Sequence, residues 1–259
     1  MKKIWIAVGV VSALALAGCG GGEKTQTKQA ETAAPAGGAA TPDLANGATV
    51  TGKVVFEGTK PVMKTLDMSA VPTCMNAHKD APQKSQEVIV NDNGTLKNAF
   101  VWVKAGLPDT TVWQVPATPV ALDQNGCMYN PHVIGVMVGQ NIDIKNSDPT
   151  NHNIHPMPTV NQEWNESQPP GTPDKMQSFP RQEVPVAVKC NIHNWMRAYI
   201  GVVGNPFFAV TGDDGTFSLK GLPPGNYTIQ VWHEKYGTQE QQITVGAKDS
   251  KTLDFTVKG

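Results

Sequence analysis

The segment from Cys190 to Met196 reads Cys-Asn-Ile-His-Asn-Trp-Met, and it decides how the rest of the chain is interpreted. Two residues separate Cys190 from His193, and two more separate His193 from Met196. On a tight loop, the thiolate, the imidazole and the thioether can therefore turn toward one point. A thiolate and imidazoles with a weak thioether form the ligand set of an electron-transfer copper site, which needs a second histidine.

Two histidines upstream can complete this set. Residues 151–155 read Asn-His-Asn-Ile-His and follow a predicted strand at 141–145, so either His152 or His155 can be the ligand. Zinc is the competing metal, although a thioether is a poor zinc ligand. The chain has no Cys-x-x-Cys-His segment of the kind that attaches haem.

Short strands and turns dominate the sequence around this loop. Apolar residues alternate at Val184, Val186 and Val188, as in a half-buried strand. Gly and Pro turns such as Asp214-Gly215 separate further predicted strands at 50–56, 96–104, 199–203, 216–219, 227–232 and 253–257, and residues 133–145 are predicted to contain two short strands around Gly139. The pattern predicts an all-β sandwich or barrel. Residues 160–181 are rich in Pro, Gln and Asn and are predicted to form an irregular loop.

The segment Gly139–Asn146 reads GQNIDIKN, and the pair His152-Asn153 and then the Cys190 loop follow it. In this order the pieces resemble the cupredoxins of the plastocyanin, amicyanin and azurin type, over residues 115–204. The short gap between His193 and Met196 resembles the amicyanin loop. The resemblance implies a Greek-key β-sandwich and one type 1 (blue) copper ion, with His152 preferred over His155 as ligand. The implied ligands are His152, Cys190, His193 and Met196.

The same resemblance suggests roles for neighbouring residues. Asn153 is expected to tie the two ligand loops together by hydrogen bonding, and His155 to lie beside the ligands or at the surface. His193 is expected near the surface, where electrons would leave. Trp195 is a candidate for partner docking, with packing as the alternative. The sequence departs from the family in the insertion at 160–181 and in Thr150-Asn151 before His152, where many members have Pro.

The two flanks resemble a second family. Residues 52–58 and 213–228 are similar to the ends of a carboxypeptidase regulatory-like, or transthyretin-like, β-sandwich. We therefore expect a discontinuous sandwich at 48–112 and 205–259, with the cupredoxin domain nested at 113–204; two tandem sandwiches are the alternative. His233 and Glu234 are expected to be surface residues.

The N-terminus has the features of a bacterial lipoprotein signal. Lys2 and Lys3 precede a short apolar run that ends in Leu-Ala-Gly-Cys19. We expect a signal peptide at 1–18, lipid attachment at Cys19 and a flexible tether at 19–47, because the tether composition cannot bury a core. The protein is then held in the cell envelope by lipid only, facing the periplasm or the cell surface.

Cys74 and Cys127 remain after Cys19 and Cys190 are assigned. In an oxidising compartment, a disulfide between them is the default expectation, and it could stabilise the fold by about 4 kcal/mol. The alternative is a second metal site with His78 and His132.

These features favour a non-catalytic electron carrier that serves a cytochrome or a membrane oxidoreductase. The alternative is a lipoprotein for copper delivery or homeostasis. A multicopper oxidase needs about ten histidine ligands, and this chain has six histidines. Without residues 1–18 the net charge is −3, so there is no basic excess to indicate a nucleic-acid partner.

Overall fold

The structure, a computed structural model, describes residues 44–259. The expected signal peptide, the lipid site Cys19 and most of the tether therefore lie outside the described residues. The described part opens with a short 3-10 helix, η1 (Leu44–Asn46), and contains one helix, α1 (Pro72–Ala77), and seventeen strands. The all-β prediction is confirmed. None of the helices within 44–259 has the length and apolar character of a membrane span.

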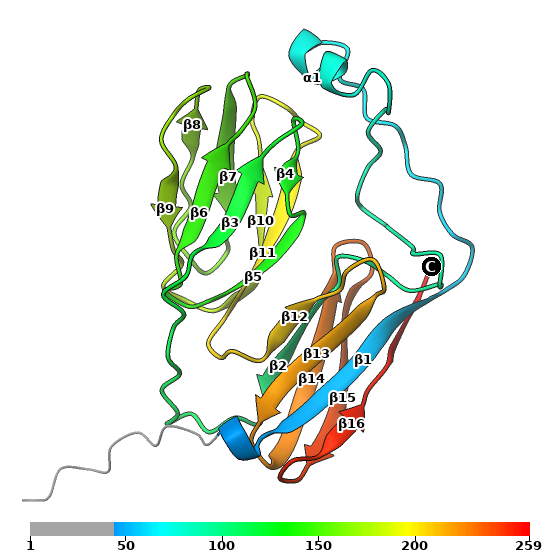
Figure 1. Cartoon of the computed structure of the whole chain (residues 1–259), viewed down its shortest axis with the longest axis vertical. Helices are drawn as coiled ribbons and strands as arrows, with labels where there is room; N and C mark the ends of the chain where they lie inside the picture. The colour runs from blue at the N-terminus through cyan, green and yellow to red at the C-terminus, as the bar shows by residue number, and fades with distance from the viewer. Residues whose placement is uncertain (1–43) are drawn as a thin grey trace, which may run out of the picture. The chain divides into compact units, whose positions relative to one another are not determined.

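One sandwich is built from both ends of the described chain (Figure 1). Its first sheet has the order β13-β1-β16, with β17 also paired to β1, and its second has the order β12-β2-β14-β15. The strands are β1 (Ala48–Glu57), β2 (Phe100–Ala105), β12 (Phe208–Val210), β13 (Thr216–Leu222), β14 (Gly225–His233), β15 (Gly237–Val245), β16 (Ser250–Thr252) and β17 (Phe255–Lys258).

Alternation along β1 explains how this sandwich closes. Val50 and Val54 are fully buried while Thr51 and Lys53 between them are exposed, as a period of two requires. The buried face packs against Ile229 and other apolar side chains of the facing sheet. β2 pairs with β14, more than 100 residues later in the chain, so the long segment between β2 and β12 is an excursion from this sandwich.

That excursion forms a second sandwich. One sheet has the order β5-β11-β10-β7-β8 and the other the order β4-β3-β6-β9. The strands are β3 (Val120–Gln124), β4 (Tyr129–Asn130), β5 (Val133–Met137), β6 (Ile142–Asn146), β7 (His152–Met157), β8 (Glu166–Gln168), β9 (Lys175–Gln177), β10 (Glu183–Lys189) and β11 (Arg197–Val203). Apolar residues such as Ile144, Val188 and Ile200 fill the space between these sheets.

The segment 160–181 is more regular than the sequence indicates. β8 pairs with β7, placing Gln168 opposite His152, and β9 pairs with β6. Gln168 is fully buried and its side-chain oxygen accepts a hydrogen bond from Gln124 at 2.5 Å. The prediction of an irregular loop was wrong at β8 and β9, where an inward-facing glutamine hides the usual apolar alternation, and it holds for the rest of 160–181, which contains no strand.

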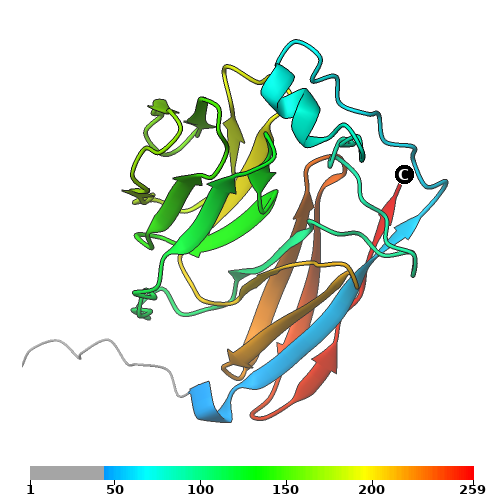
Figure 2. The same ribbon diagram turned by 45° about the horizontal axis from the view of Figure 1, so that its top comes forward.

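Residues 66–78, here called the strap, join the second core although they follow β1 of the first sandwich. Met68 and Cys74 of the strap are buried in the same cluster as Cys190 and Met196. The strap includes α1, which Figure 2 shows beside the loops of the second sandwich. It lies within the range 48–112 that the sequence analysis gave to the regulatory-like sandwich, so the chain crosses between the two cores more than once.

Close packing connects the two sandwiches. Phe100 of β2 is fully buried, and a β-carbon added at Gly201 of β11 would lie 2.4 Å from its ring. His132, at the start of β5, forms a short contact with Glu234, just after β14. His233 and Glu234 are therefore not surface residues as expected: His233 is 2 % exposed and the Glu234 side chain 9 % exposed.

Candidate metal centre

The Cys190 loop is the turn between two neighbouring antiparallel strands. β10 ends at Lys189 and β11 begins at Arg197, and these two residues face each other in the sheet. The backbone N–H of Cys190 donates to the carbonyl of Met196 at 3.2 Å, and the N–H of Met196 donates to the carbonyl of His193 at 3.0 Å. These bonds coil the seven residues tightly, so side chains three apart turn to one side.

His152 comes to this loop because it begins β7, which pairs with β10. Its ligand atom and those of Cys190 and His193 all lie within 4.8 Å of one another. The two Nδ1 atoms of His152 and His193 are 2.8 Å apart, and Cys190 Sγ is 3.8 Å from His193 Nδ1. All three side chains are buried, and Met196 is fully buried in the same cluster as Cys190.

Asp148 orients His152. Its carboxylate lies 2.8 Å from His152 Nε2, which directs Nδ1 of the same ring toward Cys190 and His193. The carboxylate is itself held by the backbone N–H groups of Gly126 and Cys127, each at 2.7 Å. Burial raises the pKa of Asp148, but the hydrogen bonds from His152 and these N–H groups outweigh it and leave the pKa below its usual value. Asp148 was not predicted from the sequence, where its only signal is its place four residues before His152.

The surroundings favour a thiolate at Cys190. Burial raises the pKa of the Cys190 thiol. Hydrogen bonds from the His152 side chain and from the backbone of Asn153 and nearby residues lower it by more, so the pKa lies below its usual value. The backbone N–H of His193 donates to Cys190 Sγ at 3.4 Å. Burial lowers the pKa of His152, but Asp148 and Cys190 more than reverse this. Burial and then the charge of His152 lower the pKa of His193.

Asn153 links the two ligand segments. Its Oδ1 accepts a hydrogen bond from the backbone N–H of Asn191 at 2.5 Å and lies 3.2 Å from Cys190 Sγ. Tyr129 donates its hydroxyl to the Asn153 carbonyl at 2.5 Å. His155 is not brought to the metal ligands; it contacts the side chains of Asn191 at 3.0 Å and Glu163 at 2.6 Å.

The strap covers the ligand that was expected to reach the surface. His193 is only 1 % exposed, and its Nε2 lies 3.9 Å from Cys74 Sγ. Cys74 is bonded to Cys127 with an S–S distance of 2.01 Å. His193 was expected near the surface, where electrons would leave; its ring is covered, because a segment 119 residues upstream packs over it.

Trp195 is half-buried rather than fully exposed. Its indole N–H donates to the Cys127 carbonyl at 3.0 Å, and its ring centroid is 5.2 Å from that of His193. The Trp195 side chain therefore packs within the protein, as the packing alternative predicted, and part of it also contacts solvent.

Whether a copper ion fits this site depends on the chemistry of the donor atoms that converge there. Two imidazole nitrogens and a thiol whose pKa lies below its usual value, in an enclosed site, suit copper or zinc, and the buried thioether of Met196 favours copper. Cys127 also lies near Asp148 and His152, but its sulfur is part of the disulfide and is not available as a thiolate. The alternative second metal site is not assembled: His78 contacts the Gly126 carbonyl at 2.6 Å, while His132 pairs with Glu234.

Residues 198–258 match the family model of the carboxypeptidase regulatory-like domain. This confirms the expected resemblance of the C-terminal flank. The match begins inside β11, which belongs to the second sandwich, and runs through β17.

The chain is also similar to solved copper proteins. One is a Cu(I) form of an amicyanin variant, at 19% identity and a TM-score of 0.27, over 40% of this chain and 98% of that one. Another is a purple cupredoxin from Nitrosopumilus maritimus, at 18% identity and a TM-score of 0.28, over 32% of this chain and 98% of that one.

A third is the copper-containing nitrite reductase NirK from Thermus scotoductus SA-01, at 20% identity and a TM-score of 0.27. That match covers 33% of this chain, which spans only 22% of the reductase. No curated protein matches the chain. Similarities with TM-scores this low are no evidence for a metal centre, which is supported by the convergence of His152, Cys190 and His193.

Proposed function

We propose that this protein is a type 1 copper protein that carries single electrons. The observation that carries the proposal is the convergence of His152, Cys190 and His193 within 4.8 Å, all three buried. Copper bound there by these residues and Met196 would supply one-electron redox chemistry.

The chain's own residues hold this site rigid and dry. Asp148 fixes the ring of His152, and Asn153 fixes the backbone beside Cys190. The backbone N–H of His193 donates to Cys190 Sγ and supports its negative charge, and the backbone of Asn153 acts in the same direction. A metal centre that carries electrons changes its charge at each electron transfer. Ligands held in fixed positions suit such a centre, because few atoms then have to move.

A carrier of this kind needs a redox partner and a location. We propose that lipid at Cys19 anchors the protein in the cell envelope after removal of residues 1–18, and that a cytochrome or membrane oxidoreductase exchanges electrons with it. We infer that the protein is not itself an enzyme. The alternative, copper delivery, favours open and exchangeable ligands, whereas the strap encloses His193.

Copper titration of the purified chain tests the proposal. With one equivalent of copper(II), we expect an intense thiolate-to-copper absorption band and a narrow hyperfine splitting in electron paramagnetic resonance. Cys190→Ser removes the band, while His155→Gln keeps it, because His155 lies outside the ligand group. Failure to take up copper, or uptake without the band, contradicts the carrier; pale copper that a chelator removes quickly favours delivery instead.

A further inference from the structure

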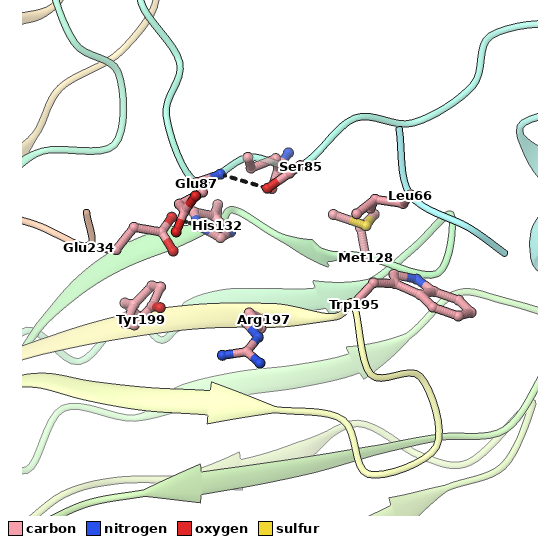
Figure 3. Close-up of a pocket in the computed structure, with 10 residues that line it drawn as sticks. Leu66, Ser85, Glu87, Met128, His132, Trp195, Arg197, Tyr199 and Glu234 are labelled. Carbon is pink, nitrogen blue, oxygen red and sulfur yellow. Dashed lines mark hydrogen bonds and ion pairs between the residues drawn. The ribbon is translucent and has the colours of Figure 1, made fainter. Parts of the chain in front are cut away.

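A second hollow lies beside the candidate metal centre. This pocket has a volume of about 390 Å³ (Figure 3). It is lined by residues from β11 and the Cys190 loop before it, by residues 85–87, by Leu66 of the strap, by Met128 and His132, and by Glu234 just after β14. Its size lies in the range of small-molecule pockets, which begins at about 300 Å³. The segments that line it come from both sandwiches, so the pocket exists only in the assembled chain.

Trp195 connects this pocket to the metal centre. Its side chain lines the pocket, and its ring packs on the ring of His193 with 5.2 Å between centroids. His193 itself is covered by Cys74. A molecule in the pocket that touches Trp195 is therefore one aromatic ring away from a buried ligand. Met128 and Leu66 give the same end of the pocket an apolar wall.

The other end of the pocket is polar. His132 is 93 % buried at the pocket wall, where its Nε2 pairs with Glu234, and its Nδ1 has no hydrogen-bond partner among residues 44–259. Nδ1 is enclosed by the protein, so the group that this end of the pocket offers to a bound molecule is the Glu234 carboxylate. Tyr199 packs edge-on against His132, and burial together with Glu234 raises the pKa of Tyr199 to about 12, so it stays a neutral phenol.

The charges at the pocket limit what can bind. Glu87 is paired with Lys235 at 3.4 Å and Glu234 with His132. Arg197 lines the pocket and is exposed, and no ion pair to it is found within residues 44–259. The positive charge of Arg197 disfavours a cationic ligand. The carboxylates of Glu87 and Glu234 disfavour a strongly anionic one. A neutral aromatic ring suits the apolar end beside Trp195, and hydroxyl groups on it suit the Glu234 carboxylate and the Arg197 guanidinium.

We propose that this pocket binds a single-ring aromatic molecule with two hydroxyl groups, of the hydroquinone class. The ring lies against Trp195, one hydroxyl bonds to the His132–Glu234 pair, and the other bonds to Arg197. If the molecule acts as an electron donor, each step transfers one electron toward the metal centre past Trp195 and His193 and one proton to the Glu234 carboxylate; the first step leaves the neutral phenoxyl radical, and a second such step leaves the quinone. The binding stands without the metal; only the role of the molecule as electron donor rests on the proposed function.

Binding is measured on the full chain carrying Cys190→Ser, without metal, with hydroquinone as the probe. Two-dimensional amide NMR follows the indole N–H of Trp195, and calorimetry gives the dissociation constant. We expect saturable shifts at this indole, with Glu234→Gln and Arg197→Gln each weakening binding about tenfold, the loss expected for one hydrogen bond to a charged group. The matched controls Glu57→Gln and Arg181→Gln, which lie outside the pocket, leave the dissociation constant unchanged.

Toluene, which lacks both hydroxyl groups, is expected to bind at least tenfold more weakly than hydroquinone. Equal binding of toluene, or the absence of saturable shifts at Trp195, overturns the proposal. Circular dichroism shows whether Glu234→Gln folds; if it does not, Arg197→Gln, at an exposed position, decides. Because copper is absent from these measurements, failure of hydroquinone binding leaves the copper titration untouched, and failure of the copper titration leaves this binding untouched.

Discussion

The Sγ atom of Cys74 lies 3.9 Å from Nε2 of His193, although 119 residues separate them in the chain. The contact is held by the bond from Cys74 to Cys127, whose own carbonyl accepts the indole N–H of Trp195. One disulfide thus fixes both the cover over a ligand and the ring beside it. The strap therefore belongs to the metal centre in structure, although its sequence carries no ligand motif.

Removal of this disulfide should weaken both the fold and the hold on copper. A loop of 53 residues is closed by the bond, which corresponds to about 4 kcal/mol in the chain-entropy model. We expect the double variant Cys74→Ser/Cys127→Ser to lose up to that much in urea unfolding, and to lose copper to a chelator faster than the parent. Substituting both residues avoids creating a new free thiol beside the ligand Cys190. Equal chelation rates would contradict the role of the strap as a cover.

Asp148→Asn tests the orientation of His152. The amide keeps the size of the carboxylate, but it weakens the contact to Nε2 at 2.8 Å and removes a charge. Loss of such a partner costs about 10–100-fold in metal affinity. We expect a copper affinity lower by this factor, measured by competition with a chelator of known affinity. Asp174→Asn is the matched control, because Asp174 pairs with Lys145 and not with a ligand; an equal loss there would indicate a general charge effect.

The sequence predicted the parts of the site that are local. Cys190 and His193 converge because two residues between them fit one tight turn, and this follows from spacing alone. The choice of His152 over His155 came from a family resemblance and not from spacing. Burial of His193 could not be predicted, because it depends on a strap whose Cys74 has no motif other than an unassigned cysteine.

The pairing of strands that lie far apart in the sequence could not be predicted from local patterns either. Individual strands such as β1 were predictable from alternation, whereas the partners of β2, which lie beyond residue 200, required the resemblance of the flanks. His233 and Glu234 were expected at the surface because polar residues usually lie there. Packing of one sandwich on the other, which no local pattern encodes, buries both.

Gly201→Ala tests that packing without touching a ligand. The added methyl would lie 2.4 Å from the ring of Phe100, which is fully buried and has no room to move. Overpacking of this kind costs about 1–3 kcal/mol. We expect a lower midpoint of thermal unfolding and an unchanged copper absorption band. Gly212→Ala is the control, since its nearest neighbouring atom is 4.0 Å away; if both variants lose the same stability, Phe100 does not hold the two sandwiches together.

His233 should make stability depend on pH. Burial lowers the pKa of His233 from 6.5 to about 4, against a raising effect of Glu234 and a further lowering by His132. Because the unfolded chain binds the proton first, this part of the stability is fully present above pH 6.5 and is lost as the pH falls toward 4. The full loss is about 3 kcal/mol, since one pKa unit corresponds to about 1.4 kcal/mol.

Urea unfolding of metal-free Cys190→Ser protein between pH 7 and pH 4 measures this effect. His233→Gln, introduced into the same background, keeps a polar side chain that does not titrate, so the difference in unfolding free energy between the two proteins should change by about 3 kcal/mol over this interval. The ligand histidines are common to both proteins and cancel in that difference. A difference that stays constant with pH would mean that His233 becomes protonated in the folded state as readily as in the unfolded chain.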